Sequence, residues 1–234
     1  MKVSIIIPFY NCPYIDQAIQ SALNQTYKNI EVIVVNDGST KYIEKIKPFL
    51  KQIKYLEKVN GGTASALNMG IQNATGEYFA WLSSDDIYHP QKTQNQLYFL
   101  QSNNFSASYT NYYLINEKGS VISPPQGINI TTKLQFLKIM KRKCIINGCT
   151  VMLKMNIFNE FGLFDETLKY TQDYDFWLRI LKKYDISNYN EPLVNYRIHS
   201  NMGTKKYKAA IRLETLETIN RHKGKINELI QTCK

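Results

Sequence analysis

The sequence predicts an α/β fold in which a mostly parallel central sheet is flanked by helices on both faces. Three observations lead to this prediction. In the first half of the 234-residue chain, β-branched runs alternate with segments whose apolar residues recur at helical spacing. Polar or glycine-rich loops follow the strands, as they do at the ligand-binding edge of parallel sheets. In the second half this alternation breaks down, which indicates a mixed architecture there.

Strand and helix patterns alternate in order from the N-terminus. We expect strands over residues 3–8, 31–35, 54–59 and 78–82, and helices over 14–23, 42–52, 63–73 and 90–101. The first helix, for example, carries Ile15, Ile19 and Leu23 on one face. The resulting βαβαβαβα order implies parallel strands that are joined by helical crossovers on both faces of the sheet.

The rest of the chain has fewer regular patterns. We expect strands over residues 107–115 and 120–123, joined by a turn at 117–119, and helices over 132–141 and 173–184. Apolar spacing over 209–219 predicts a terminal amphipathic helix. The chain is therefore expected to form one domain over residues 1–204, which changes character near residues 103 and 104. A basic helical tail is expected over 205–234.

Composition and charge limit the classes of function. The 44% hydrophobic and 21% charged residues are typical of a globular protein, and no apolar run approaches the roughly 18–20 residues that span a bilayer. The net charge of +10 is concentrated over 133–143 and 205–225, which indicates an anionic partner such as a nucleotide diphosphate, a nucleic acid or an acidic membrane. Because no secretion signal is visible and the four cysteines lack zinc or redox spacing, we expect a cytoplasmic protein with reduced thiols.

Two adjacent carboxylates, Asp85 and Asp86, follow the apolar strand over 78–82. Such a pair is self-repulsive unless water solvates it or a hard divalent cation takes up its charge. A metal site at the ligand edge of the sheet is one interpretation. The other is a solvated entry into the helix that begins at Pro90, because proline suits the first helical position.

Two earlier strand ends face the same edge. The loop from Pro8 to Asn11 has no glycine, and neither GxGxxG nor GxxxxGK[ST] occurs in the chain, which argues against a dehydrogenase and a Walker ATPase. Tyr10 suits either stacking on a base or packing in a turn. Asp37 suits either a hydrogen bond from a base or ribose, or an Asx turn before Gly38.

A third loop is rich in glycine and other small residues, Asn60-Gly-Gly-Thr-Ala-Ser-Ala-Leu-Asn-Met-Gly70. Small residues let a helix N-terminus approach a phosphate, whose charge is favoured by exposed amides and by the helix dipole. The same residues also permit close packing of a helix on a sheet. Both interpretations stay open when this loop is considered alone.

Taken in order, these loops resemble family 2 of the inverting glycosyltransferases, which have the Rossmann-like GT-A fold. The resemblance covers roughly residues 3–200 and rests on Val3-Ser-Ile-Ile-Ile-Pro-Phe-Tyr-Asn11, Val34-Val-Asn-Asp-Gly-Ser-Thr40, the third loop, and Trp81-Leu-Ser-Ser-Asp-Asp86. It implies transfer from a nucleoside-diphosphate sugar, usually UDP-linked, to a glycan or lipid-linked acceptor. Residues 1–103 would bind the nucleotide, and residues 104–204 would face the acceptor and hold the base.

The family's nucleotide-binding roles carry over to matching positions. Asp37 would accept a hydrogen bond from the base imino group. The other residues that hold the base or line the nucleotide pocket would be Pro8, Tyr10, Asn60, Gly62 and Asn68. Many members have arginine where this chain has Leu67, which removes one partner of the diphosphate.

The fourth motif would bind ribose and Mn²⁺ or Mg²⁺. By this resemblance Asp86 is the direct metal ligand, and Ser84 and Asp85 support ribose, bound water or the same ion. Arg197 and His199 belong to a segment that often closes over the donor, where they would contact the diphosphate or the metal. A structural role for this histidine is the alternative.

The helix predicted over 173–184 holds the candidate base. At 100° per residue Asp173 lies about 40° from Trp177, on the inward stripe. Asp175 lies on the opposite side, where an exposed pair with Arg179 explains it. The resemblance implies that Asp173 deprotonates the acceptor hydroxyl, and the alternative is that it stabilises the start of the helix. Because Asn147 and Gly148 lie before Asp173 in the sequence, they are candidates for the lining of the acceptor pocket.

Three departures from the family pattern, at Ser83, Leu67 and Gln172, support an alternative in which the protein binds a nucleotide sugar without transferring it. A nucleic-acid-binding module is disfavoured because acidic loops occupy the predicted crevice. The basic tail suits peripheral contact with the acidic cytoplasmic face of a membrane, a solvated helix or an oligomer contact. The sequence does not specify an oligomeric state.

Overall fold

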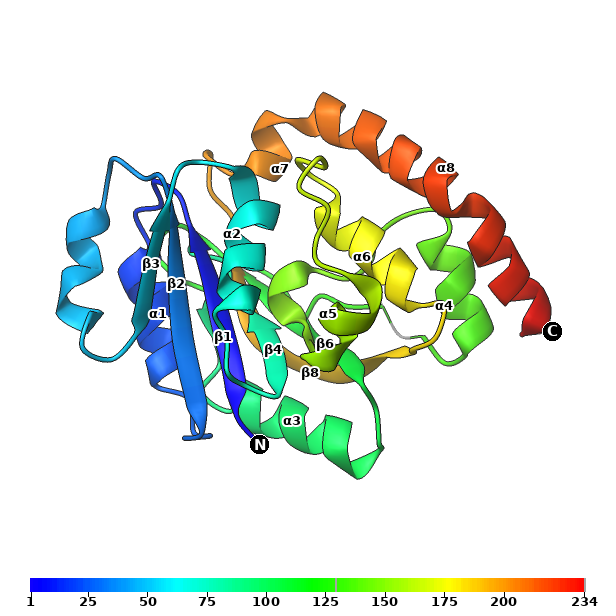
Figure 1. The fold of residues 1–234 in the computed structure, drawn as a ribbon, viewed down its shortest axis with the longest axis horizontal. Coiled ribbons are helices and arrows are strands. Elements are labelled where there is room, and N and C mark those ends of the chain that lie inside the picture. Colours follow the sequence, from blue (N-terminus) through cyan, green and yellow to red (C-terminus); the bar gives the residue numbers. More distant parts are fainter. Residues whose placement is uncertain (129, 234) are drawn as a thin grey trace.

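The computed structural model describes residues 1–128 and 130–233 and contains a sheet of eight strands. Figure 1 shows this sheet covered by helices. The strand order is β3-β2-β1-β4-β7-β6-β8-β5. In chain order the strands are β1 (Val3–Phe9), β2 (Ile30–Asp37), β3 (Lys54–Lys58), β4 (Tyr78–Trp81), β5 (Ile87–Tyr88), β6 (Ala107–Ile115), β7 (Met152–Lys154) and β8 (Ile186–Arg197).

The two halves of the sheet differ in strand direction. β1 pairs with β2 and β4, and β2 pairs with β3, all in parallel. β7 is antiparallel to β4 and to β6, whereas β8 is parallel to β6 and antiparallel to β5. The parallel first half and the mixed second half are therefore confirmed, and the sheet as a whole is mixed.

Helices cover both faces because alternate side chains of the buried strands point in opposite directions. Ile5 and Ile7 of β1 pack in one apolar cluster with α1 and α3, whereas Ile6 packs in another with α2, α5 and α6. The helices are α1 (Ile15–Leu23), α2 (Gly62–Gln72), α3 (Lys92–Ser102), α4 (Lys133–Met140), α5 (Asn156–Phe161), α6 (Gln172–Ile180), α7 (Gly203–Lys206) and α8 (Lys208–Thr232).

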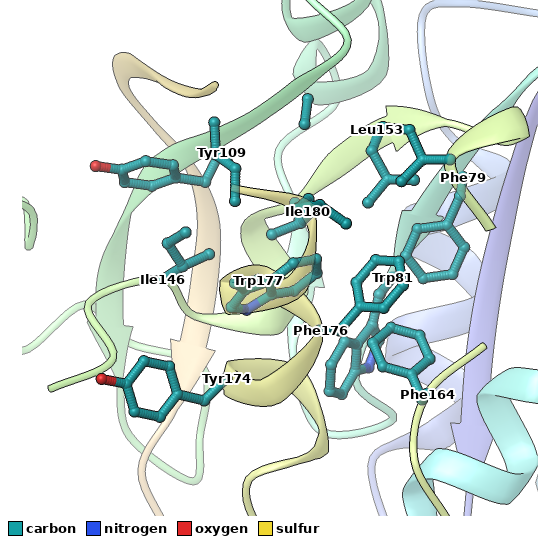
Figure 2. Packing of buried hydrophobic residues seen from close by; sticks show 14 of the residues in the cluster. Phe79, Trp81, Tyr109, Ile146, Leu153, Phe164, Tyr174, Phe176, Trp177 and Ile180 are labelled. Atoms are coloured by element: carbon teal, nitrogen blue, oxygen red, sulfur yellow. The ribbon is translucent and has the colours of Figure 1, made fainter. Parts of the chain in front are cut away.

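An aromatic cluster fixes α6 beside β4 (Figure 2). The ring of Phe176 in α6 lies 4.9 Å from that of Phe158 and 4.8 Å from that of Phe164, measured between centroids. Trp81, at the end of β4, contacts Phe164 edge-on at 6.2 Å. Each such pair contributes about 0.5–1.5 kcal/mol beyond its area burial. α6 and the end of β4 are therefore packed together through these rings.

Two predicted elements are wrong. In place of a helix over 42–52, the chain forms two 3₁₀ turns, Ile43–Lys45 and Lys47–Phe49. Pro48 lacks an N–H and its ring clashes with the preceding turn, so a continuous α-helix is interrupted there. The predicted strand over 120–123 is reduced to a single bridge between Val121 and Ile115.

The sequence patterns do not predict the short elements β5, β7 and α5, or the long strand β8. β8 contains Pro192 and several asparagines, and the pairing of β6 with β8 shifts register on both sides of Asn111. An irregular strand of this kind lacks the period-two alternation that identifies strands in a sequence.

The predicted terminal helix is confirmed as α8, which packs across α6 and α4 (Figure 1). Residue 234 of the predicted tail lies outside the described residues. Among the helices of residues 1–128 and 130–233, none combines the length and the hydrophobicity that a bilayer span requires.

Candidate functional site

A cavity of about 660 Å³, here called the first cavity, lies at the carboxyl ends of β1, β2 and β4. The predicted residues Pro8, Tyr10, Asp37, Ser84 and Asp85 all line it. They come together because parallel strands present their carboxyl ends at the same edge of the sheet. Tyr10 is 55% exposed as a residue, which leaves its side chain accessible to a ligand.

The opposite wall of the first cavity comes from late segments of the chain. It includes Tyr170 and Gln172 at the start of α6, Thr204 in α7, and Tyr207 and Ile211 around the start of α8. The family motifs end at His199, so they did not indicate the residues of α7 and α8, and the sequence singled out Gln172 only as a departure from the family pattern. A helix that looked like an appended tail therefore forms part of the candidate site.

Three lysines, Lys41, Lys169 and Lys206, line the first cavity. None of them forms an ion pair with another residue of the described ranges. Cations from three different segments that converge on one cavity without acidic partners favour an anionic ligand.

Asp37 connects the end of β2 to the loop before α2. Its Oδ1 accepts hydrogen bonds from Lys58 Nζ at 3.0 Å and Gly61 N at 2.9 Å, and its Oδ2 accepts from Gly62 N at 2.8 Å and Asn60 Nδ2 at 3.1 Å. Gly62 has a φ of +88°, a left-handed conformation that favours glycine. The side chain of the neighbouring Asn36 accepts a hydrogen bond from Ser39 N and so makes the turn around Gly38. The Asp37 carboxylate instead orders the glycine-rich loop.

Asn68 does not face the first cavity. Its side chain is buried, donates to Phe164 O at 2.9 Å and Glu166 Oε1 at 2.8 Å, and accepts from Phe164 N at 3.0 Å. This amide therefore fixes the loop between α5 and α6. The expected role of Asn68 in the nucleotide pocket does not fit its position, whereas Asn60 and Gly62 act through Asp37.

The adjacent carboxylates occupy different environments. Asp85 lines the first cavity, and its Oδ2 lies 3.0 Å from His199 Nε2. Asp86 is 1% exposed and its Oδ1 accepts from Arg197 N at 2.8 Å. Burial, together with the nearby charge of Asp85, raises the pKa of Asp86 well above its ordinary value. The accessible position therefore belongs to Asp85, and this placement does not favour Asp86 as the direct metal ligand.

Arg197 is also buried, with no exposed surface. Its guanidinium donates to Asp85 O at 2.8 Å and Gln17 Oε1 at 2.7 Å, and to the carbonyls of Asn116 and Glu117 at 3.1 and 3.0 Å. These bonds use four of its five N–H donors inside the protein. The expected contact of Arg197 with the diphosphate does not fit this arrangement, and Arg197 instead holds the loop that carries Asp85.

The donor set at Asp85 suits a divalent cation that is shared with a ligand. No group of three histidine, cysteine, aspartate or glutamate side chains that could hold a metal occurs within residues 1–128 and 130–233. Asp85 and His199 nevertheless supply one carboxylate and one imidazole beside the cavity. Mg²⁺ characteristically binds through one or two carboxylates and completes its coordination with phosphate oxygens and water. The Asp85 carboxylate therefore fits a hard divalent cation that is shared with phosphate oxygens of a ligand.

Asp173 faces a second cavity, of about 450 Å³, which it lines together with Tyr109, Asn111, Lys143 and Asn147. Burial raises the pKa of Asp173 to about 6, while its Oδ1 accepts a hydrogen bond from Tyr174 N at 2.7 Å. A carboxylate with this pKa can accept a proton near neutral pH. The predicted placement of Asn147 beside Asp173 fits this lining.

The two cavities share a wall. Tyr196 at the end of β8 and Thr204 in α7 line both of them. Asp85, after the end of β4, and the candidate base Asp173 therefore line adjoining cavities. Two ligands that react with each other would require such an arrangement.

Asp175 is not exposed, contrary to the expectation from helical spacing. It is 2% exposed, and its carboxylate bonds Arg179 Nε at 2.8 Å and His222 Nε2 at 2.8 Å. The pair with Arg179 is confirmed, but α8 covers it. The partner His222 lies 47 residues further along the chain, so no local pattern could reveal this burial.

Comparison with known proteins yields a consistent set of matches. A family model described as "Glycosyl transferase family 2" matches residues 4–162. An "Uncharacterized glycosyltransferase" of Rickettsia felis is 44% identical over 212 residues, which cover 87% of this chain and 35% of that protein. A second relative, from Rickettsia typhi, is 44% identical and is covered to 64%. The chain thus spans about a third to two thirds of these relatives.

Other relatives carry more specific names. The "UDP-Glc:alpha-D-GlcNAc-diphosphoundecaprenol beta-1,3-glucosyltransferase WfaP" of Escherichia coli is 35% identical over 223 residues, which cover 90% of this chain and 83% of that protein. Among solved structures, S. aureus TarS 1-349 in complex with UDP-GlcNAc superposes with a TM-score of 0.73 at 20% identity, covering 92% of this chain and 66% of that one. The likeness to TarS shows a common fold, and the GT-A expectation is confirmed.

Proposed function

Because the chain belongs to glycosyl transferase family 2, we propose that it transfers a sugar from a UDP-linked donor to an acceptor hydroxyl, with inversion at the anomeric carbon. The single observation that carries this proposal is the shared wall between the cavity of Asp85 and the cavity of Asp173. The names of the E. coli relative and of the TarS complex support the choice of a UDP sugar.

The nucleotide would lie in the first cavity, on the loops after β1 and β2. Tyr10 offers an exposed aromatic face for the base, and Pro8 lines the wall beside it. Asp37 would accept the base imino N–H. Its four acceptor positions are already filled, and Lys58 Nζ also donates to Val59 O. Lys58 is therefore the donor that the imino N–H of the base would displace from Asp37 most easily.

The diphosphate would lie between Asp85 and the lysines of the first cavity. Asp85 and His199 would hold Mn²⁺ or Mg²⁺. When bound, the ion would neutralise the charge that develops on the departing diphosphate. Lys41, Lys169 and Lys206 surround the cavity and lower the cost of bringing a polyanion there. Asp86 and Arg197 would hold the loop that carries Asp85 through their buried hydrogen bonds.

The acceptor would lie in the second cavity, with its hydroxyl near Asp173. Asp173 would remove the hydroxyl proton as the oxygen forms a bond to the anomeric carbon and the bond from that carbon to the diphosphate breaks. The proton ends on the Asp173 carboxylate, and the electron pair leaves with the diphosphate. General-base assistance of this kind contributes about 10²–10⁴ in rate.

The pKa of Asp173 predicts the pH dependence of transfer. The base must be ionised, and burial raises its pKa to about 6. The rate is therefore expected to be nearly constant above that pKa and to fall about tenfold for each pH unit below it. Measurement of UDP release between about pH 5 and about pH 8 checks this fall in rate on the acid side, the acid limb of the pH profile. A rate that rises as the pH falls below 6 would contradict the assignment.

The acceptor class is proposed from the E. coli relative, whose name specifies a GlcNAc-diphosphoundecaprenol acceptor. A lipid-linked acceptor of this kind would place the transfer at the cytoplasmic face of a membrane. On α8, Leu213 and Leu216 are 63% and 51% exposed, and Lys208, Arg212 and Lys223 lie on the same helix. Exposed leucines with basic neighbours suit the surface of an acidic bilayer.

The membrane role predicts selective binding to acidic vesicles. Wild-type protein is expected to sediment with phosphatidylglycerol vesicles and to stay in solution with phosphatidylcholine vesicles. Changing both Leu213 and Leu216 to serine should reduce sedimentation severalfold, because apolar burial in the interface is lost while the fold keeps its core. Equal sedimentation of the two proteins would dismiss this role of α8.

A donor screen tests the function itself. Nucleotide sugars are added with Mn²⁺, and thermal unfolding is followed, because a ligand that binds the native state raises Tm by mass action. UDP sugars are expected to raise Tm, and release of UDP should follow when a lipid-linked acceptor is added. Stabilisation without any UDP release would favour a binding protein that does not transfer, and no response to any nucleotide sugar would overturn the proposal.

A further inference from the structure

A single side chain of α8 holds the segment that leads into α6. Glu214 Oε1 accepts hydrogen bonds from Tyr170 N and Thr171 N, both at 2.7 Å, and from Thr171 Oγ1 at 2.8 Å. Its Oε2 accepts from Lys169 N at 3.1 Å. A carboxylate has about four acceptor positions, so the hydrogen bonds from this segment occupy most of the acceptor positions of Glu214.

Two more residues extend this contact along the same face of α8, at intervals of four. Thr218 Oγ1 lies 2.8 Å from Thr171 Oγ1, and His222 Nε2 lies 2.8 Å from Asp175 Oδ1. Residues four apart on a helix share a face, so Glu214, Thr218 and His222 form one row. The row contacts the chain two residues before and two residues after Asp173, and Figure 1 shows α8 lying over α6.

We propose that Glu214 is a positioning residue for the candidate base Asp173, an inference that rests on the proposed transferase function. By engaging three consecutive N–H groups, Glu214 sets where α6 begins, and hence where the Asp173 carboxylate lies in the second cavity. Hydrogen bonds to an ionised carboxylate are about twice as strong as neutral ones. The same segment presents Lys169, Tyr170 and Gln172 to the first cavity, so Glu214 orders both cavities at once.

Glu214 also acts on Asp173 through its charge. Burial is the main cause of the raised pKa of Asp173, and the negative charge of Glu214 adds to it. Removing that charge should lower the pKa of Asp173. The acid limb of the pH profile, the range in which the rate falls, therefore reports whether this charge acts on Asp173, while kcat of the folded variants reports the positioning role.

The test compares Glu214→Ala and Glu214→Gln with Glu217→Gln. Glu217 is an exposed carboxylate on the same helix, with no hydrogen bond to another described residue, and serves as the matched control. Glu214→Ala is expected to lower kcat by about 10-fold to 100-fold, with a smaller change in KM for the donor. Glu214→Gln keeps one acceptor oxygen and should recover part of the loss. In both variants the acid limb should lie at lower pH than in wild-type protein.

Hydrogen exchange of residues 169–175 gives a readout that does not depend on turnover. Exchange should rise in Glu214→Ala and stay at the wild-type rate in Glu217→Gln. Should Glu214→Ala fail to fold, the pH profile of the isosteric Glu214→Gln decides. Wild-type kcat and an unmoved acid limb in the Glu214 variants would overturn this inference alone, whereas a wild-type protein that neither binds UDP nor releases it from any donor would overturn the proposed function.

Discussion

Replacing Asp173 with asparagine is expected to lower kcat for sugar transfer by about 10²–10⁴ while leaving the Kd for UDP unchanged. The reason is that Asp173 lines the second cavity and not the first, so it would contact the acceptor and not the nucleotide. The amide keeps the shape of the side chain but cannot take the proton of the acceptor hydroxyl. Transfer is measured as UDP release, and binding by calorimetry.

Asp185→Asn provides the control for this change. Asp185 is an exposed carboxylate after α6 that pairs with Lys133 at the surface, 2.7 Å away. Exposed ion pairs contribute little, so this variant should retain wild-type activity and stability. Undiminished turnover in Asp173→Asn would eliminate Asp173 as the base and direct attention to other groups of the second cavity.

The second large effect is expected at Asp85. Asp85→Asn should weaken Mn²⁺-dependent binding of UDP by about 10-fold to 100-fold or more, since even changes in residues that only support metal ligands cost that much. Binding measured without metal should change much less. Calorimetry of UDP with Mn²⁺, and with the metal removed by EDTA, separates the two contributions.

Asp86→Asn is the informative comparison, because the two carboxylates are adjacent and differ in accessibility. Asp86 is buried and accepts a hydrogen bond from Arg197 N, so its substitution should lower Tm and leave the metal dependence of UDP binding in place. The opposite result, loss of metal dependence in Asp86→Asn alone, would restore Asp86 as the direct ligand and exclude the arrangement proposed for Asp85.

The strand-end loops were predictable because their chemistry is local and their convergence is a property of parallel sheets. Pro8, Tyr10, Asp37, Ser84 and Asp85 lie within or just after the last residues of three different strands, yet the topology brings all of them to one cavity. The order of the motifs along the chain is sufficient to place such residues, since each lies at the end of a regular strand.

Other roles depend on contacts between distant parts of the chain, which no local pattern records. Asn68 has the expected neighbours in sequence, but Phe164 and Glu166 take its amide. Arg197 donates hydrogen bonds to carbonyl groups of the loop that follows β6 and of the loop that carries Asp85. In both cases burial of a polar side chain among specific partners decides its role, and these partners are identified only by the three-dimensional structure.

The terminal helix shows the same limit most clearly. Its spacing predicts an amphipathic helix, and its charge suggests a solvated or membrane-facing tail. In the structure, Glu214, Thr218 and His222 form a row that makes hydrogen bonds to α6 and to the residue before it. An amphipathic pattern reveals that one face of a helix is covered but not what covers it.

The product of the reaction tests the central claim most directly. The protein is incubated with UDP-glucose, Mn²⁺ and a GlcNAc-diphosphate lipid, and the anomeric configuration of the transferred glucose is determined by NMR. We predict a β-linked product, formed with inversion from the α-linked donor, and its loss in Asp173→Asn. An α-linked product, or equal yields from wild-type and Asp173→Asn proteins, would contradict a single displacement assisted by Asp173.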